Sequence, residues 1–514
     1  MIGAQAPARP VGTLPARYTH KYLILAICCL SLFIVSTDAT IVNVALPSIG
    51  RELGSTISGL QWTIDAYTLV LASLLMLSGS TADRIGRRRT FQIGLVLFGV
   101  GSLLCSLAPS VGWLVVFRMI QAVGGSMLNP VAMSIITATF ADPKQRVRAV
   151  GVWSAVVGVS LGLGPVLGGY LTDSVGWRAI FLVNVPVVIL ALALTALFVP
   201  ESKSGRVGRF DPVGQGLVIL LLAALVGGLI EGPNLGWLSV GTVALFVVFA
   251  IAVIGLISYE RRRTDPLIDV RFFRSVPFSS AVATAIFAYA SNGAFLFLVT
   301  LYLQEVRGFT PFEAGLHTLP VAVTQLICAP LSGRLVAEFG TRVPLVLSGL
   351  ALAVAAGVLT TIGAHTSIAI LLSAFAVFGV GLGLVNAPIT NTAVSGMPKS
   401  RVGSAAAVAS TSRQVGISVG VALAGTLTGV HGMARVGSDF ALSTHTMWWT
   451  IVGLGAGVSV LAVVANTEWA RRSVEGIAYL FAEPSVNASP ATSSAPRRTT
   501  AESASPSTPG RRTR

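Results

Sequence analysis

The stretch Gly79-Ser-Thr-Ala-Asp-Arg-Ile-Gly-Arg-Arg88 is repeated later in the chain as Gly333-Arg-Leu-Val-Ala-Glu-Phe-Gly-Thr-Arg342. In both copies glycine occupies the first and eighth positions and arginine the tenth. A second set of glycines recurs at nearly the same offset: Gly151 and Gly168 in the first copy, Gly403 and Gly420 in the second. This repeat indicates that the chain consists of two parallel halves.

Composition places the chain in a membrane. Of its 514 residues, 53% are hydrophobic and only 11% are charged, whereas a soluble domain carries about 25% charged residues. Many apolar runs reach the ~20 residues that a membrane helix needs. The net charge of +15 comes from short Lys and Arg clusters between these runs, which is a pattern of membrane topology and not of a nucleic-acid-binding face. We therefore expect the lipid bilayer, and no nucleic acid, as a partner.

The apolar runs predict about fourteen spans, which are helices because lipid cannot pair with free backbone groups. Six spans precede the region 212–259 and six follow it, so the two spans of that region form an insertion between matched halves. Parallel halves are typical of transporters, whose substrate site lies between them near the bilayer midplane. The predicted spans are 22–47, 58–82, 90–108, 112–137, 149–172, 178–199, 212–231, 237–259, 276–302, 314–337, 343–363, 367–390, 403–430 and 446–466.

The fold class is therefore an all-α polytopic membrane protein with two six-helix halves and two inserted helices. The tail is rich in Ser, Pro, Ala, Thr and Arg, a composition typical of disorder. The predicted parts are a cytoplasmic N-terminal segment (1–21), an N-terminal half (22–200), two inserted helices with cytoplasmic linkers (201–275), a C-terminal half (276–467) and a disordered cytoplasmic tail (468–514).

The distribution of Lys and Arg predicts the orientation, because loops rich in these residues stay in the cytoplasm. The alternate loops hold little beyond Arg51, Arg178, Arg307 and Arg435. An even number of spans agrees with two cytoplasmic termini, and the first apolar run is too long for a removable signal peptide. The loops assigned to the cytoplasm hold Arg84, Arg87, Arg88 and Arg89; Lys144, Arg146 and Arg148; Lys203, Arg206 and Arg209; Arg261, Arg262 and Arg263; and Lys399 and Arg401.

Three charged residues, Asp38, Asp65 and Arg118, lie inside apolar runs, where a charge costs at least ~2.5 kcal/mol. From a rise of 1.5 Å per residue, Asp38 lies roughly 13 Å and Asp65 roughly 10 Å below the outer ends of their spans, with Arg118 slightly shallower. We therefore expect the three side chains together in the outer part of the first half. Burial raises the pKa of a carboxylate and a nearby arginine lowers it. A carboxylate under both influences suits reversible protonation or cation binding. The alternative is a static buried ion pair beside one permanently protonated Asp.

The first repeat closely resembles the signature loop of the major facilitator superfamily. The resemblance implies that the loop helps to latch the two halves on the cytoplasmic side. In this chain the latching carboxylate would be Asp83, supported by Arg84 and Arg88, with Gly79 and Gly86 bracketing a tight connection. The second copy has Ala337 in place of that carboxylate, which puts the same chemistry there in doubt.

Other segments resemble the fourteen-span drug:proton antiporters of that superfamily, the QacA/EmrB type, which include exporters of antibiotic-producing bacteria. Asp38-Ala-Thr-Ile-Val-Asn43 and Arg118-Met-Ile-Gln121 resemble its first-span and proton-coupling motifs. Gly164-Pro165 with Gly168-Gly169, preceded by Gly151, resembles the helix motif of drug antiporters, although Ser160 replaces one expected Gly. Close helix packing alone is the other explanation of these glycines. Further matches are Trp177-Arg178, Asn184-Val-Pro186, Tyr302-Leu-Gln304 and Arg413-Gln414.

Three polar residues inside spans, Asn43, Gln121 and Arg413, are candidates for substrate contacts. Each also has a structural interpretation. Asn43 and Gln121 suit ordinary hydrogen bonds between helices. Arg413 suits a donor to backbone carbonyls of a broken helix, and the sequence leaves the two roles of Arg413 open.

The resemblance implies a proton-coupled exporter in the bacterial inner (plasma) membrane that moves a lipophilic antibiotic or toxic compound by alternating access, functioning as a monomer. Acidic residues in the spans weakly favour cationic compounds, and the substrate itself is not readable. A metabolite or nutrient transporter of the same fold is the alternative. The chain has no Walker motif for ATP, and its five His lie in loops or at span ends, so we expect no enzyme, no metal and no cofactor. The asymmetric charge argues against a passive channel.

Overall fold

The computed structural model describes residues 20–203, 211–263, 266–398, 401–429 and 440–481. Within these ranges the regular structure is helical throughout. The predicted N-terminal segment up to residue 19, the linker residues 204–210 and the tail beyond residue 481 lie outside the described residues, as do 264–265, 399–400 and 430–439.

The first half consists of six spanning segments. These are α1 (Lys21–Leu53), α2 (Ile57–Ile85), α3 (Arg87–Ser106), α4 (Val111–Thr139), α5 (Pro143–Ser174) and a sixth that is broken into α6 (Ala179–Leu182) and α7 (Asn184–Phe198). The inserted pair is α8 (Pro212–Leu235) and α9 (Val240–Glu260), followed by the short 3-10 helix η1 (Val270–Arg274).

The second half repeats this arrangement. It comprises α10 (Val276–Leu301) with the π-helical turn η2 (Tyr302–Val306), α11 (Pro311–His317) with α12 (Leu319–Phe339), α13 (Arg342–Leu359), α14 (Ile368–Val394), α15 (Val402–Thr428), and α16 (Phe440–Ser443) with α17 (His445–Val464). A last helix, α18, covers Glu468–Phe481.

Thirteen helices in the described ranges are long and apolar enough to cross a membrane by length and composition. The remaining predicted span, 403–430, corresponds to α15, which is 27 residues long. α15 is more polar because it carries the run Ser410-Thr-Ser-Arg-Gln414. It nevertheless packs between α10 of its own half and α2 of the other half, so it is part of the helix bundle.

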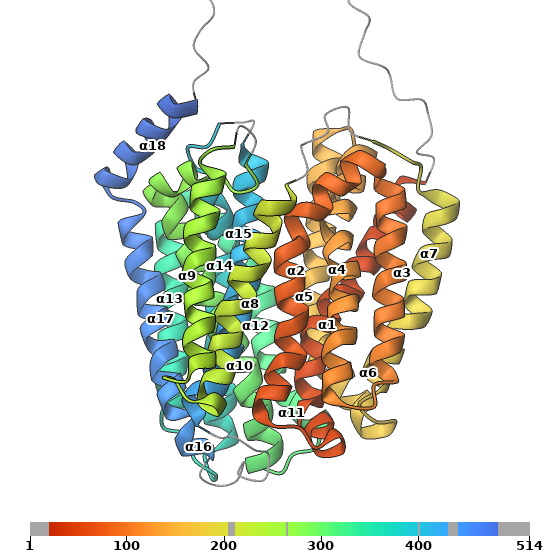
Figure 1. Cartoon of the computed structure of the whole chain (residues 1–514), viewed down its shortest axis with the longest axis vertical. Coiled ribbons are helices and arrows are strands. Elements are labelled where there is room, and N and C mark those ends of the chain that lie inside the picture. The colour runs from red at the N-terminus through yellow and green to blue at the C-terminus, as the bar shows by residue number, and fades with distance from the viewer. Residues whose placement is uncertain (1–19, 204–210, 264–265, 399–400, 430–439, 482–514) are drawn as a thin grey trace, which may run out of the picture.

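The two halves stand side by side, with α8 at their boundary and α9 on the outer side of α8, over the second half in this view (Figure 1). α8 packs on α9, on α2 of the first half and on α15 of the second. We call the end of the bundle with the α2–α3, α4–α5 and α9–η1 connections the basic end. The end with the α1–α2, α5–α6 and η2–α11 connections is the opposite end. α18 lies at the basic end, at the top of Figure 1.

The sequence repeat has a structural counterpart. Gly86 ends α2 with a φ of 114° and Gly340 ends α12 with a φ of 72°, backbone conformations that favour glycine. Gly79 does not bracket this turn as expected, because it lies inside α2, where an added Cβ would meet no heavy atom within 4 Å. The tight connection therefore depends on the second glycine of each copy.

The second set of repeated glycines packs equivalent helices together. α5 packs on α1, where a Cβ on Gly168 would lie 2.7 Å from the carbonyl oxygen of Ile41. α15 packs on α10, where a Cβ on Gly420 would lie 2.0 Å from the carbonyl oxygen of Ala290. Gly151 differs from the expected packing role, because no heavy atom lies within 4 Å of an added Cβ there.

The tail differs from the expectation of disorder over its first 14 residues, which form α18. Ser473 Oγ accepts a hydrogen bond of 3.0 Å from the backbone N–H of Val276, at the start of α10. Trp469 is 65% exposed, whereas the neighbouring Ala470 is fully buried. The helix is thus docked on one side, and average composition alone does not reveal such a side.

Gly168→Val should destabilise the protein by about 1–3 kcal/mol, because overpacking forces two helices apart. We expect a lower melting temperature of the purified protein in detergent. Gly151→Val is the matched control, with the same substitution on the same helix in open space. Equal melting temperatures for the two variants would contradict the assigned α1–α5 contact.

Candidate functional site

Asp38 of α1 and Arg118 of α4 form an ion pair inside the first half. Arg118 Nη1 lies 2.5 Å from Asp38 Oδ2, and the two residues are 0% and 1% exposed. Gln121 Nε2 donates a 2.8 Å hydrogen bond to Asp38 Oδ1, and Asn184 Nδ2 donates one of 3.2 Å to the same oxygen. The carboxylate thus receives three donors. We call Asp38, Arg118, Gln121, Asn184 and Ser102 the Asp38 network.

Helix geometry explains how α4 supplies two members of this network. Arg118 and Gln121 are three residues apart, so their side chains lie on the same face of α4. They also contact each other, because Arg118 Nη1 donates to Gln121 Oε1 at 2.8 Å. Asn184 begins α7 immediately after the break from α6, which lets it approach Asp38 from a third direction.

The guanidinium of Arg118 is fixed on its other sides as well. Its Nε donates to the carbonyl oxygen of Thr63 at 3.3 Å. Its carbon Cζ lies 4.1 Å from the centre of the Tyr67 ring and 5.7 Å from that of Phe181, within the range of cation–π attraction. The arginine therefore lies in an enclosed site between α2, α4 and α6, and its side chain does not extend to the membrane surface.

Ser102 of α3 completes the network. Its hydroxyl accepts hydrogen bonds from Gln121 Nε2 at 3.3 Å and Asn184 Nδ2 at 3.1 Å. It donates to the carbonyl oxygen of Phe181 at 2.8 Å. Neither Ser102 nor Thr63 can be singled out from the sequence. A serine in an apolar span is a weak signal, and a backbone carbonyl has no sequence signal at all.

Asp65 lies apart from this network, which corrects the expectation that the three charges form one site. Its Oδ1 lies 3.4 Å from Thr68 Oγ1, which is itself 2.5 Å from the hydroxyl of Ser418 on α15. Asp65 is 0% exposed, and its Oδ2 has no partner. At about 100° per residue, positions 63 and 65 of α2 point roughly 200° apart. The Thr63 carbonyl therefore faces Arg118, whereas Asp65 faces the other half.

The two halves are joined by hydrogen bonds near the opposite end. Gln61 Nε2 donates to the carbonyl oxygens of Val421 and Ala422 at 2.7 and 2.9 Å. Gln304 Nε2 donates to the carbonyl oxygen of Val44 at 2.8 Å. Arg51 and Glu305 form an ion pair of 2.5 Å. These contacts hold α1 and α2 against α15 and η2.

The Gly-Pro segment of α5 contributes to the same junction. A Cβ on Gly169 would lie 2.3 Å from the carbonyl oxygen of Pro311, and one on Gly315 would lie 2.4 Å from that of Pro165. On its other side, Gly164 lies against Thr40 of α1. The glycines of this segment therefore allow α5 to touch α1 in its own half and α11 in the other half.

The signature loop is tied to the end of α7 in its own half. Asp83 lies 3.9 Å from Arg87, and Arg88 Nη2 donates to the carbonyl oxygen of Ala196 at 2.7 Å. The backbone N–H groups of Arg88 and Arg89 donate to the two carboxylate oxygens of Glu201, at 3.2 and 3.3 Å. Arg88 is thus engaged with α7 and not with Asp83 as expected. Arg84 lies in the last turn of α2.

The remaining candidates lie elsewhere. Arg413 of α15 donates from Nη2 to the hydroxyl of Thr390 on α14 at 2.6 Å, and its Nε is buried without a partner. Of the two roles left open for Arg413, donation to the backbone of a broken helix is not the one seen for Nη2, which donates to this side chain. Asn43 donates to carbonyl oxygens of its own helix, Ala39 at 3.3 Å and Thr40 at 3.5 Å. In the part of the chain that the structure describes, no three His, Cys, Asp or Glu side chains group as metal ligands would.

Comparison with known proteins places the chain among transporters. Residues 28–421 match the model of the Major Facilitator Superfamily. The multidrug resistance protein Stp of Mycobacterium tuberculosis is 38% identical over 398 residues, which are 77% of this chain and 74% of that protein. The tetracenomycin C resistance and export protein of Streptomyces glaucescens is 36% identical, over 79% and 75% of the two chains. The methylenomycin A resistance protein of Streptomyces coelicolor is 35% identical, over 86% and 92%.

Two solved structures share the fold. A bacterial homologue of the human lysosomal transporter Spinster, in an inward-facing and unoccupied conformation, has a TM-score of 0.59 and 16% identity, with 90% of this chain and 99% of that one covered. A bacterial homologue of human drug and peptide transporters has a TM-score of 0.60 and 15% identity over the same shares.

Asn184→Ala should destabilise the protein by about 1–3 kcal/mol, because it removes one donor from a buried carboxylate. Asn43→Ala is the control, since Asn43 donates only to carbonyls of its own helix. Thermal unfolding in detergent should give a clearly lower melting temperature for the Asn184 variant. A larger loss for the Asn43 variant would show that the Asp38 network is not what Asn184 supports.

Proposed function

Since the chain belongs to the major facilitator superfamily, we propose that it exports a lipophilic antibiotic or toxic compound in exchange for protons, by alternating access. The similarity to the tetracenomycin C resistance and export protein supports export as the direction of transport. The observation that carries the proton part is the buried Asp38–Arg118 pair. We expect no enzymatic activity and a functional monomer.

The contacts of Asp38 fit its deprotonated form. All three partners donate N–H groups to its oxygens, from Arg118, Gln121 and Asn184. A proton on either oxygen would place an O–H group against one of these donors and remove the charge that Arg118 binds. The network must then rearrange, so protonation of Asp38 is coupled to a movement of α1 against α4. Asp38 is in this account the proton carrier, and Arg118 and Gln121 position it.

Asp65 is proposed as a second site, at the boundary between the halves. Its Oδ1 accepts from the hydroxyl of Thr68, which in turn contacts the hydroxyl of Ser418, and its Oδ2 is unpaired. A proton on Oδ2, or a cationic group of the substrate beside it, would supply the missing partner. Because Ser418 belongs to the second half, separation of α2 from α15 would remove that hydroxyl from the site. Asp65 therefore responds to the distance between the halves.

Orientation follows from the basic loops, which we assign to the cytoplasm together with both termini. The protein is then a multi-pass protein of the bacterial plasma membrane whose periplasmic end is the opposite end. The contacts of Gln61, Gln304 and Arg51 close the path between the halves at that end. Export requires them to break, so we propose that they form the outer gate.

Asp38→Asn should lower the initial rate of export of every substrate at least about tenfold, because Asn cannot exchange a proton. Asp65→Asn should mainly reduce export of cationic compounds. The assay is efflux of ethidium and of an uncharged antibiotic from cells of a drug-sensitive host. Glu338→Gln, which neutralises an exposed carboxylate at the basic end of α12, is the matched control and should export normally.

Collapse of the proton gradient with an uncoupler should stop export in the wild type. Full export by Asp38→Asn would refute the coupling role of Asp38. If the protein confers resistance to no compound in a broad panel, a metabolite transporter of the same fold replaces the proposed exporter.

A further inference from the structure

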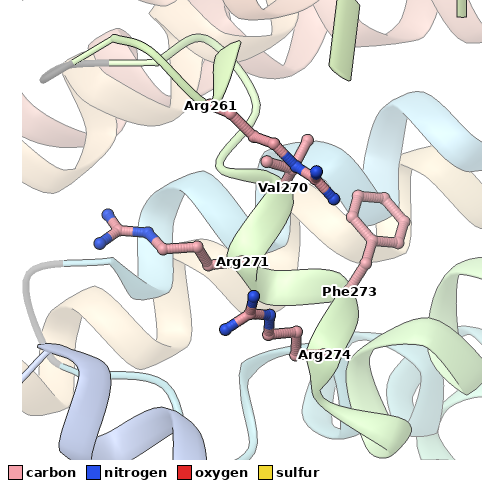
Figure 2. Close-up of a pocket in the computed structure, with 5 residues that line it drawn as sticks. All are labelled: Arg261, Val270, Arg271, Phe273 and Arg274. Carbon is pink, nitrogen blue, oxygen red and sulfur yellow. The ribbon is translucent and has the colours of Figure 1, made fainter. Parts of the chain in front are cut away.

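A basic cavity lies at the basic end, between the end of α9 and the 3-10 helix η1. It has a volume of about 450 Å³ and is lined by Arg261, Val270, Arg271, Phe273 and Arg274. Figure 2 shows Arg261 reaching from the end of α9 toward Val270 and Phe273, with Arg271 and Arg274 on η1. The lining thus comes from the end of α9 and from η1, and it combines three arginines with two apolar residues. In the view of Figure 2 the Arg271 side chain extends away from Arg261 and Phe273.

The charges around this cavity are not all neutralised by the protein. Arg271 donates to both carboxylate oxygens of Asp269, at 2.9 and 2.7 Å. Burial alone would raise the pKa of Asp269, but these hydrogen bonds lower it below its usual value, so Asp269 stays ionised and offsets Arg271. In the ranges that the structure describes, no acidic side chain pairs with Arg261 or Arg274. The cavity therefore carries an excess of about two positive charges.

Arg261 also continues an apolar stripe of α9. Val247, Ile251 and Ile254 are 50%, 62% and 65% exposed. At about 100° per residue, positions 247, 251, 254 and 261 lie within roughly 80° of one another around the helix. From Val247 to Arg261 the stripe is roughly 21 Å long at 1.5 Å per residue. That is enough to cross the roughly 15 Å of hydrocarbon in one leaflet.

We propose that this cavity binds the phosphate headgroup of an anionic membrane phospholipid, whose acyl chains lie along the exposed stripe of α9. Arginine forms paired hydrogen bonds to phosphate oxygens, and Arg261 and Arg274 approach the cavity from two different elements. At about 450 Å³ the cavity is far larger than the roughly 10–15 Å³ that a single water needs. Val270 and Phe273 suit the apolar part of a lipid, which inorganic phosphate lacks.

The position of the site gives the lipid a structural role. α9 belongs to the inserted pair, whereas η1 leads directly into α10, the first helix of the second half. A phosphate held by Arg261 and Arg274 joins these two parts without a protein–protein contact. The inserted helices thereby fix the second half to the surrounding anionic lipid. Basic loops that only set the membrane orientation would need neither this cavity nor a bound lipid.

The test compares the full-length wild type with Arg261→Gln/Arg274→Gln in detergent. Phosphatidylglycerol should raise the melting temperature of the wild type by several degrees, and native mass spectrometry should show at least one more bound lipid than in the variant. In the variant the affinity for this lipid should fall at least tenfold. Arg148→Gln/Arg334→Gln removes the same charge at exposed positions of the basic end and should keep the wild-type response.

Three outcomes would overturn the proposal. Equal lipid binding by the wild type and Arg261→Gln/Arg274→Gln would show that the cavity is not the site. An equal effect of phosphatidylcholine would remove the requirement for net negative charge, and an equal effect of inorganic phosphate would identify a soluble anion as the ligand. If the Gln variant does not fold, Arg261→Lys/Arg274→Lys replaces it and should retain selectivity for phosphatidylglycerol. Loss of that selectivity in a folded Lys variant would contradict a site based on positive charge.

Discussion

The buried pair of Asp38 and Arg118 constrains the whole first half. Either charge alone would cost at least ~2.5 kcal/mol at this depth, and removing one partner of a buried pair typically costs about 3–5 kcal/mol. The pair is acceptable because Gln121, Asn184 and the Thr63 carbonyl satisfy the remaining donors and acceptors. Since these groups come from α2, α4 and α7, the ion pair fixes how those helices pack around α1.

Because the pair needs all of these partners, a change in the protonation of Asp38 can change how the helices pack. Among the described residues, every hydrogen-bond partner of the Asp38 oxygens is an N–H donor, so the arrangement has no acceptor ready for a proton on Asp38. In the proposed cycle, loss and gain of that proton select between two packings of α1. Asp65 differs because its neighbour Ser418 lies on α15. Asp38 thus responds to the packing of helices within one half, and Asp65 responds to the distance between the two halves.

Much of the fold could be predicted from the sequence, because lipid enforces long apolar helices and the repeat of Gly86 and Gly340 marks equivalent turns. The Asp38–Arg118 contact was also within reach, since motif and depth both point to it. The side to which Asp65 points was not, because hydropathy does not determine how a buried helix is rotated. Ser102 and the Thr63 carbonyl could not be predicted either, because a serine in an apolar span is a weak signal and a backbone carbonyl has none.

Other differences have local causes. Gly151 was expected to pack against another helix and Gly79 to bracket a tight connection, but both face open space. A motif does not reveal what lies opposite each position. α18 lies in a tail whose average composition predicts disorder, and an average does not reveal that one side of this helix is docked. The place of α8 at the boundary between the halves depends on contacts such as the hydrogen bond from Gln215 Nε2 to the Ser73 carbonyl at 2.6 Å. No pattern in the sequence predicts such contacts.

The most direct test of the account is the proton release that accompanies substrate binding to the purified protein in weakly buffered detergent solution. An exporter that exchanges protons for drug at Asp38 should release protons when substrate is added to the wild type. The Asp38→Asn variant should still bind substrate. Its proton release should fall to zero or to the amount that Asp65 alone supplies. Release from Asp38→Asn equal to that of the wild type would contradict the assignment of Asp38 as the proton carrier.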